Sequence, residues 1–178
     1  MTDTAAAPAA TTRPPAFGDL ENELATTRRV LERVADEHWD WKPHEKSKSL
    51  GALATHVAEI PFLASLVLTT DEFNAAGANR WPQGAPTNRE QLLAAFDAAA
   101  TAVTSAIGSV PADGWGKTWQ LRMGDQVFVS LPRAAALRVL GISHLVHHRA
   151  QLTVYLRLLN IPVPSVYGPS ADEAPAGR

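Results

Sequence analysis

The chain has 178 residues, which is the length of one domain with short terminal segments, and a single core of this size can fold unaided. Its net charge of −2 indicates no nucleic-acid surface, and the absence of cysteine excludes disulfides, thiolate metal sites and a cysteine nucleophile. The N-terminus lacks the pattern of a signal peptide, and we find no apolar run that predicts a membrane span. We therefore expect a soluble cytoplasmic protein.

The first part of the chain predicts a tail and two helices. Residues 1–16 are rich in Ala, Thr and Pro and have no apolar period, which is typical of a disordered segment. In residues 17–38, side chains suited to a buried face recur every three or four positions, which predicts a helix. These side chains are Leu20, Leu24, Thr27, Leu31 and Val34. A second helix is predicted from Ser49, a suitable N-cap, to about Thr70.

A third helix and a short hairpin are predicted next. Residues Thr87 to Glu90 (TNRE) fit a capping box, in which the Thr hydroxyl and the Glu side chain satisfy each other's backbone amides. The helical period then continues until Pro111 closes the segment. Residues 117–131 (KTWQLRMGDQVFVSL) are the only strand-like stretch, and Gly124-Asp125 suits a hairpin turn.

The fourth helix is predicted from Pro132 to Leu159, with Asn160 as its C-terminal stop. Residues 169–178 are small and polar and are expected to form a fraying C-terminal tail. Four long amphipathic helices predict an all-α four-helix bundle over residues 17–168, with the hairpin inserted before the last helix.

Three histidines are the candidate metal ligands. His144 and His148 are four residues apart on the last helix, so both project toward the core, whereas His147 is turned away from His148. His56 lies on the inner stripe of the second helix, between Leu53 and Ile60. Buried imidazoles must either find hydrogen-bond partners or share a cation. Hydrogen-bonded core histidines and a three-histidine metal site are the two readings of this pattern, and we favour the metal site.

Other side chains carry weaker signals. Glu59 follows His56 by three residues, which suits a fourth ligand, an acceptor for a ligand, a general base or a salt bridge. Arg149 is expected to pair with the C-terminal Ala-Asp-Glu segment rather than to anchor a substrate. The five tryptophans fill either the core or the walls of a pocket at the mouth of the bundle; they are Trp39, Trp41, Trp81, Trp115 and Trp119.

Two stretches resemble one known family. Residues 40–61 (DWKPHEKSKSLGALATHVAEIP) and residues 144–173 (HLVHHRAQLTVYLRLLNIPVPSVYGPSADE) are similar to the DinB/YfiT-like metalloenzymes, with the same order of elements after the N-terminal tail. The resemblance implies a four-helix bundle with a metal bound by His56, His144 and His148, and it implies a homodimer. Ala150 departs from the glycine that usually follows the His-His-Arg motif, which puts the shape of any adjacent pocket in doubt.

The resemblance also implies a reaction, because some relatives transfer a low-molecular-weight thiol to an electrophile or use it to isomerise a substrate. We expect a metal-dependent thiol transferase or hydrolase-like enzyme with Glu59 as its catalytic residue. The alternative is a non-catalytic metal-binding or stress-related module. Zinc, nickel, iron and copper all suit three imidazoles. An open metal position beside a concave pocket favours the enzyme, and a closed metal site favours the module.

Overall fold

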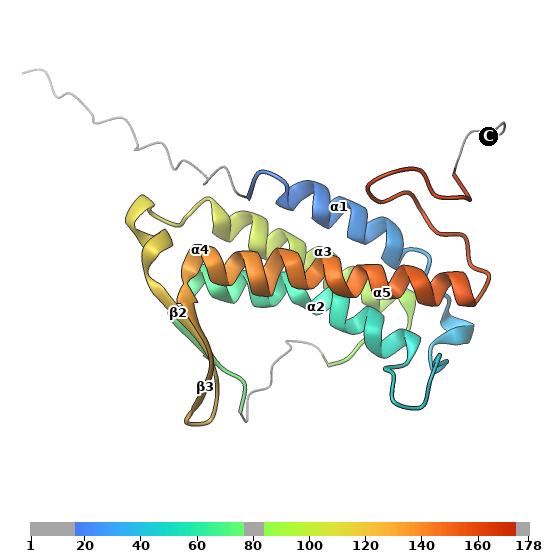
Figure 1. Ribbon diagram of the computed structural model, residues 1–178, viewed down its shortest axis with the longest axis horizontal. Helices are drawn as coiled ribbons and strands as arrows, with labels where there is room; N and C mark the ends of the chain where they lie inside the picture. Colours follow the sequence, from blue (N-terminus) through green and yellow to red (C-terminus); the bar gives the residue numbers. More distant parts are fainter. Residues whose placement is uncertain (1–16, 77–83, 174–178) are drawn as a thin grey trace, which may run out of the picture.

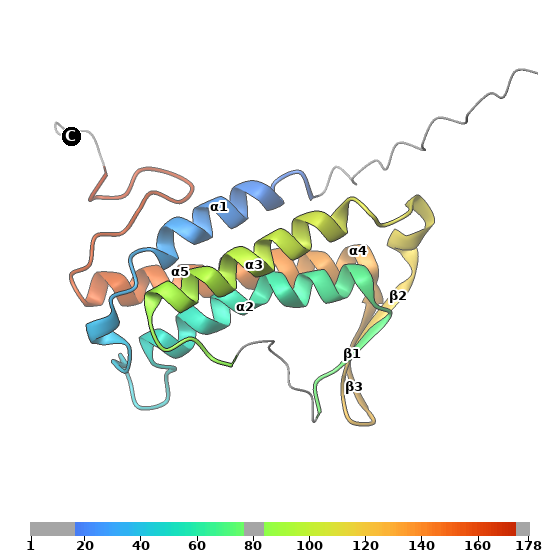
Figure 2. The same cartoon turned by 180° about the vertical axis from the view of Figure 1, so that it is seen from behind.

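The computed structural model describes residues 17–76 and 84–173, and within them helices run side by side as a bundle (Figure 1). The predicted N-terminal tail and Trp81 lie outside the described residues. The bundle is built from α1, α2, α3 and a continuous rod formed by α4, η4 and α5. A small sheet projects from the end of the bundle where α4 begins (Figure 2). The all-α four-helix bundle with an inserted hairpin is therefore confirmed.

The first helix, α1 (Leu20–Leu31), is shorter than predicted. Its last turn is followed by extended backbone at Ala35 and by the 3-10 turn η2 (Asp36–His38). Val34 is fully buried although it lies beyond the helix, so its apolar side chain continued the helical period in the sequence without continuing the helix.

The second helix, α2 (Leu50–Thr69), has the predicted start, because Oγ of Ser49 accepts a hydrogen bond from the amide of Ala52 at 3.2 Å. It is long and apolar enough to resemble a membrane span, with a mean hydropathy of 1.5. However, 67% of that span is buried inside the bundle, as in the core helix of a soluble protein. The helix packs against α3 and α5, so its apolar surface is covered by the protein itself.

The third helix, α3 (Arg89–Ile107), begins one residue later than predicted. Oδ1 of Asn88, not the hydroxyl of Thr87, accepts the amide of Gln91 at 2.9 Å. Oε1 of Gln91 in turn accepts the amide of Thr87 at 3.1 Å. Asn is at least as good an N-cap as Thr, so the adjacent residue takes the role that the TNRE pattern assigned to Thr87.

The hairpin forms as predicted, and a third strand joins it. Strand β2 (Thr118–Met123) pairs antiparallel with β3 (Gln126–Pro132), and Gly124 turns the chain with a φ of 61°. Strand β1 (Glu72–Asn74) pairs parallel with β2 and was not expected. Another 3-10 turn, η3 (Ala112–Gly116), leads into the hairpin.

The last rod is not one uniform α-helix. Between α4 (Arg133–Ala136) and α5 (His144–Leu158), the segment η4 (Leu137–Ser143) is a π-helix. A π-helical segment adds backbone to a helix and changes the phase of the next turns, and such segments are frequent at functional sites. The end is as predicted, because Asn160 has a φ of 58° and the amide of Ile161 reaches the carbonyl of Leu156 at 2.9 Å.

The C-terminal segment returns along α1 (Figures 1 and 2). Asp172 accepts a hydrogen bond from Arg157 at 3.1 Å, and a carboxylate oxygen of Glu173 accepts the amide of Ser165 at 2.8 Å. Residues 172 and 173 of the predicted C-terminal tail are thus hydrogen-bonded to the rest of the chain. The remaining residues, 174–178, lie outside the described part of the chain.

Candidate metal centre

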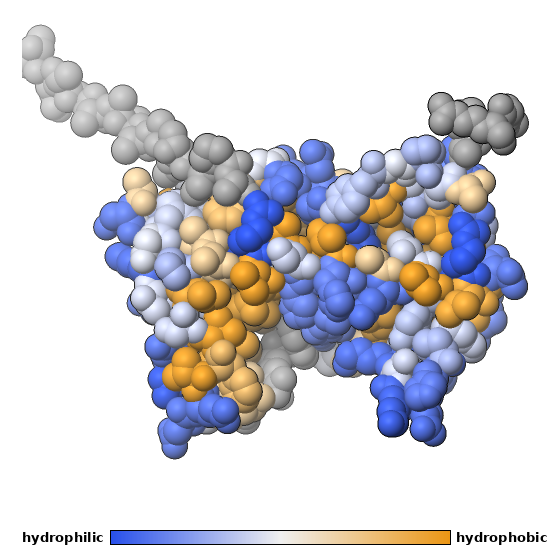
Figure 3. Space-filling model, in the orientation of Figure 1, coloured by the Kyte–Doolittle hydropathy of each residue, from blue (hydrophilic) through white to orange (hydrophobic). Residues whose placement is uncertain are grey.

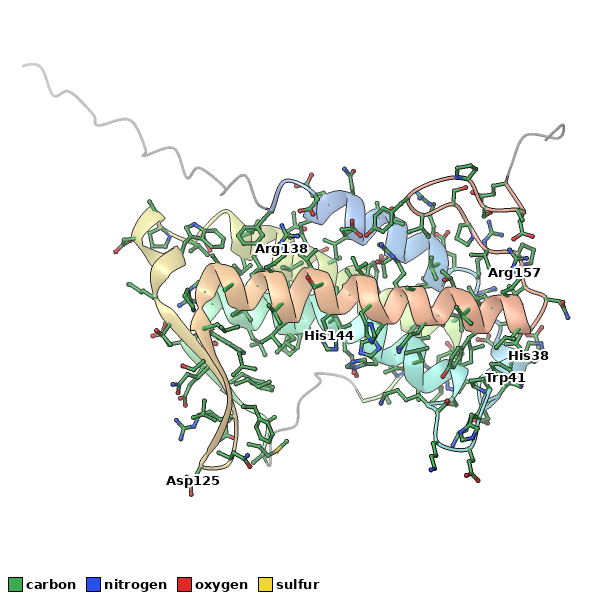
Figure 4. The ribbon with its side chains drawn as sticks, viewed as in Figure 1. His38, Trp41, Asp125, Arg138, His144 and Arg157 are labelled. Carbon is green, nitrogen blue, oxygen red and sulfur yellow. The ribbon has the colours of Figure 1, made fainter. Side chains whose placement is uncertain are left out.

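Three histidines from two helices meet inside the bundle. His56 comes from α2, and His144 and His148 come from successive turns of α5. Each offers one ring nitrogen such that these three atoms all lie within 4.8 Å of one another. Figure 4 shows His144 on the side of its helix that faces α2. The cluster is partly buried, and it is the arrangement that the face argument and the family resemblance both predicted.

The spacing of the donor atoms fits a metal ion. Nε2 of His56 and Nε2 of His144 are 3.2 Å apart. Two nitrogens about 2.0–2.1 Å from one tetrahedral metal lie roughly 3.3–3.4 Å apart, so the observed pair needs little adjustment. The same distance also suits a hydrogen bond from one neutral imidazole to the other, which remains the alternative reading.

The outer nitrogens of the rings differ in their partners. Nδ1 of His148 is 2.7 Å from Oε1 of Gln151, which lies one turn further along α5. An amide oxygen can only accept, so this contact places the proton of a neutral His148 on Nδ1 and leaves Nε2 free as a donor atom. Nδ1 of His144 is buried without a well-aligned hydrogen bond. The carbonyl of Leu140 in η4 is the backbone acceptor for this ring, and it opposes the lowering of the pKa of His144.

The environment keeps the three rings neutral. Burial, together with the charges of His148, His144 and Lys48, lowers the pKa of His56 to about 4. Burial, with His148 as the next cause, also lowers the pKa of His144. The pKa of His148 is likewise lowered, mainly by burial. Neutral imidazole is the form that binds a metal, so near pH 7 the cluster offers three lone pairs without first losing protons.

Glu59 and two histidines border the same cavity. The cavity has a volume of about 400 Å³ and lies between α2 and the sheet. Burial raises the pKa of Glu59 to about 7, although the charge of Lys48 opposes the shift. A carboxyl group with this pKa can take up or release a proton near neutral pH. The cavity is lined by His56, Glu59, Ile60, Leu63, Phe73, Ala75, Leu121, Arg122, Met123, Phe128 and His144.

The sequence model of the DinB family matches residues 17–176, which is nearly the whole chain. This chain belongs to the DinB family. It is also 30% identical to the uncharacterized protein YrdA of Bacillus subtilis (strain 168) over 154 residues, which covers 86% of each protein. The family part of the resemblance is therefore confirmed.

Solved structures agree with the DinB fold. A DinB-like protein from Bacillus cereus ATCC 10987 superposes with a TM-score of 0.64 at 20% identity, covering 85% of this chain and 95% of its own. The DinB-like protein YjoA from Bacillus subtilis superposes with a TM-score of 0.66 at 17% identity, covering 88% of this chain and 99% of its own. At these identities the likeness shows the fold alone.

The prediction for Arg149 in this DinB protein was wrong. Arg149 does not reach the C-terminal Ala-Asp-Glu segment: it is buried, and its Nη1 lies 2.7 Å from a carboxylate oxygen of Glu23 on α1. Tyr167 completes the group, because its hydroxyl is 2.8 Å from Nη2 of Arg149. The carboxylate of Asp172 in that segment pairs instead with Arg157.

The described tryptophans fill the core or pack on neighbouring rings and do not line the cavity. Trp119 is fully buried, Trp115 stacks on Phe17 and Trp41 meets Tyr155 edge to face. The ring of Trp39 occupies the space where a side chain at Gly51 would stand. Aromatic side chains from the sheet, Phe73 and Phe128, line the cavity in their place.

Sequence reasoning missed the partners of the ligand candidates. Gln151 was not predicted as a partner of His148, although its three-residue spacing from His148 on a helix is compatible with the contact that is observed. The role of Leu140 depends on the π-helix, which no sequence signal indicated. Ala150, where the family usually has glycine, is exposed and borders neither the cavity beside Glu59 nor the histidine cluster.

Proposed function

We propose that this DinB-family protein is a metalloenzyme in which His56, His144 and His148 hold one divalent metal ion, and that it transfers a low-molecular-weight thiol to an electrophile. The observation that carries the proposal is the meeting of three neutral imidazoles, two of which line a cavity large enough for a small molecule. Zinc and nickel suit such a donor set, and iron is also compatible.

Three protein ligands leave room for a thiol at the metal. A divalent cation at this position supplies Lewis-acid chemistry, because it lowers the pKa of a thiol that approaches it. The protein contributes no cysteine, so the nucleophilic sulfur must arrive with the cosubstrate. The partial burial of the cluster limits the water that would otherwise compete for the open position.

Glu59 is the proposed proton acceptor. In the transfer, the thiol sulfur forms a bond to carbon of the electrophile, and the leaving group departs with the electron pair of the bond that breaks. The thiol proton passes to the carboxylate of Glu59, whose pKa of about 7 lets it accept and later release the proton at neutral pH. Glu59 borders the same cavity as His56 and His144, so it faces the space where the reaction would occur.

A transfer assay tests the proposal. Protein stripped with a chelator and protein reloaded with zinc or nickel are compared for transfer of a small thiol to 1-chloro-2,4-dinitrobenzene, followed by absorbance. The metal-loaded form should be faster, and Glu59→Gln should keep the metal but slow transfer by roughly 10²–10⁴-fold. Equal rates with and without metal would contradict the enzyme and favour the non-catalytic metal-binding module. Loss of metal from Glu59→Gln would make Glu59 a ligand rather than a base.

We further propose that the protein is a cytoplasmic homodimer. The cytoplasmic location is inferred from the sequence pattern, and the dimer is inferred from the family resemblance. The exposed apolar side chain of Leu158 on α5 supplies surface that a second copy would cover.

A further inference from the structure

The three-histidine cluster lies between two cavities that differ in polarity and in charge. The cavity between α2 and the sheet touches His56 and His144. A second cavity of about 470 Å³, on the other side of the cluster, touches His148. We propose that the two substrates reach the cluster from opposite sides: an uncharged, largely apolar electrophile in the first cavity and a thiol bearing a carboxylate in the second. This inference rests on the proposed function and names its substrate classes.

Apolar side chains dominate the first cavity. Phe128 on β3 and Met123 at the end of β2 are 58% and 43% exposed, although they are large hydrophobic residues. Figure 3 shows the resulting hydrophobic surface over the hairpin. Leu63 on α2 and Phe73 on β1 also line the cavity and are only partly covered by the core. Apolar surface left beside a cavity in this way is typical of a ligand site.

A β-bulge in the sheet places Phe128 in the lining of the first cavity. Leu121 pairs with Val129 and Arg122 pairs with Val127, so Phe128 is the extra residue of a β-bulge. Bulges re-aim side chains and are frequent beside functional sites. The guanidinium of Arg122 lies 3.8 Å from a carboxylate oxygen of Glu72, so its charge is already partly matched. A substrate in this cavity therefore needs no charge of its own.

The second cavity is the more polar of the two, and it carries the positive charge of Lys48. Besides His148 it is lined by Ser47, Lys48, Leu53, Gln151, Val154 and Tyr155. The ammonium group of Lys48 is exposed, and within residues 17–76 and 84–173 it makes no hydrogen bond or ion pair. Its charge nevertheless acts on His56 and His148, which places it close to the cluster. A carboxylate on the thiol would give Lys48 a partner while the sulfur reaches the histidines.

The apolar cavity is tested with chelated protein and the uncharged fluorescent probe N-phenyl-1-naphthylamine. The wild type should bind the probe, and Phe128→Ser should weaken binding at least about threefold, because apolar contact is lost. Val127→Ser is the matched control, since Val127 lies on the same strand and is 41% exposed but does not line the cavity. Equal affinity of Phe128→Ser and wild type, or an equal loss in Val127→Ser, would overturn the apolar assignment.

The polar cavity is tested by calorimetry on zinc-loaded protein at low salt. Lys48→Gln should weaken 3-mercaptopropionate by about three- to tenfold and leave the uncharged 2-mercaptoethanol unchanged. Lys46→Gln, in the same loop but outside the cavity, should change neither thiol. Parallel losses for both thiols, or none, would overturn the role of Lys48. If neither thiol binds zinc-loaded wild type, the proposed function fails together with the thiol cavity, whereas the probe experiment still decides the apolar cavity because it uses no metal.

Discussion

At the scale of single residues, the cluster depends on which ring nitrogen carries the proton. Gln151 fixes this for His148, because its amide oxygen accepts from Nδ1 and turns Nε2 toward the other two histidines. His147 illustrates the opposite case. Its ring contacts that of His148 with centroids 4.7 Å apart, yet it is exposed and lies outside the group of donor atoms. Adjacent histidines on one helix thus have different roles.

Gln151→Leu should therefore lower metal affinity without removing a ligand. Loss of the acceptor frees the ring of His148 to rotate and to change tautomer, and loss of such a partner typically costs about 10–100-fold in affinity. Gln151→Glu keeps an acceptor at the same position and should retain most of the affinity. Competition with a chromogenic chelator measures both variants, and unchanged affinity in Gln151→Leu would show that the contact does not orient the ligand.

The pH dependence of stability should separate Glu59 from the histidines. Folding lowers the histidine pKa values, so between about pH 6.5 and 4 the unfolded chain binds more protons and metal-free protein loses stability as the pH falls. Folding raises the pKa of Glu59 from 4.5 to about 7, so its contribution is present in acid and is lost as the pH rises through 7. These two effects oppose each other in the wild type.

In Glu59→Gln only the histidines contribute to this pH dependence. Acidification should therefore destabilise the metal-free variant more steeply than the wild type. The difference should reach about 1–2 kcal/mol between pH 7 and 4.5, after allowance for partial exposure. Urea unfolding at a series of pH values measures it. Parallel curves for the two proteins would mean that the carboxyl group of Glu59 titrates normally.

At the scale of elements, periodicity predicted the four rods because their buried faces repeat at helical spacing. It did not predict where α1 ends, because Val34 lies beyond the end of the helix and is nevertheless fully buried. Strand β1 has three residues and exists only through its pairing with β2, which is distant in sequence. The π-helix η4 was likewise not predicted from the sequence. The ligand candidates were predictable because a helix fixes the phase of His144 and His148, whereas the partner of Arg149 depends on how α1 packs.

The contact between α1 and α5 is a buried ion pair that should dominate local stability. Side chains of Arg149 and Glu23 are 1% and 10% exposed. Arg149→Met leaves the Glu23 carboxylate without its cationic partner and should lower the free energy of unfolding by about 3–5 kcal/mol. Arg157→Met, which breaks the more exposed pair with Asp172, should lower the free energy of unfolding far less, because solvent screens that pair.

Urea unfolding compares the two arginine variants, and the double variant Arg149→Met with Glu23→Gln should recover part of the loss. If Arg149→Met and Arg157→Met were equally stable, the buried pair would not hold α1 against α5. The comparison is also a control for the metal site, because neither arginine contributes an atom to the histidine group.

At the scale of the whole molecule, the bundle places donors from distant parts of the chain at one point between two cavities. A second copy covering α5 should leave both cavities accessible only if it avoids Val154, which borders the polar one. Light scattering of the wild type should give twice the chain mass of 19.1 kDa, and Leu158→Glu should shift it toward the monomer. A wild type that is monomeric at micromolar concentration would end the dimer proposal.

The central claim is that His56, His144 and His148 together hold a metal ion, and zinc titration calorimetry on the chelated protein tests it most directly. The wild type should bind about one equivalent per chain, and alanine at any of the three positions should weaken binding by more than about 100-fold. His147→Ala, on the same helix but outside the donor group, should bind nearly as tightly as the wild type. Absence of binding in the wild type, or His147→Ala as the most damaging change, would contradict the assignment.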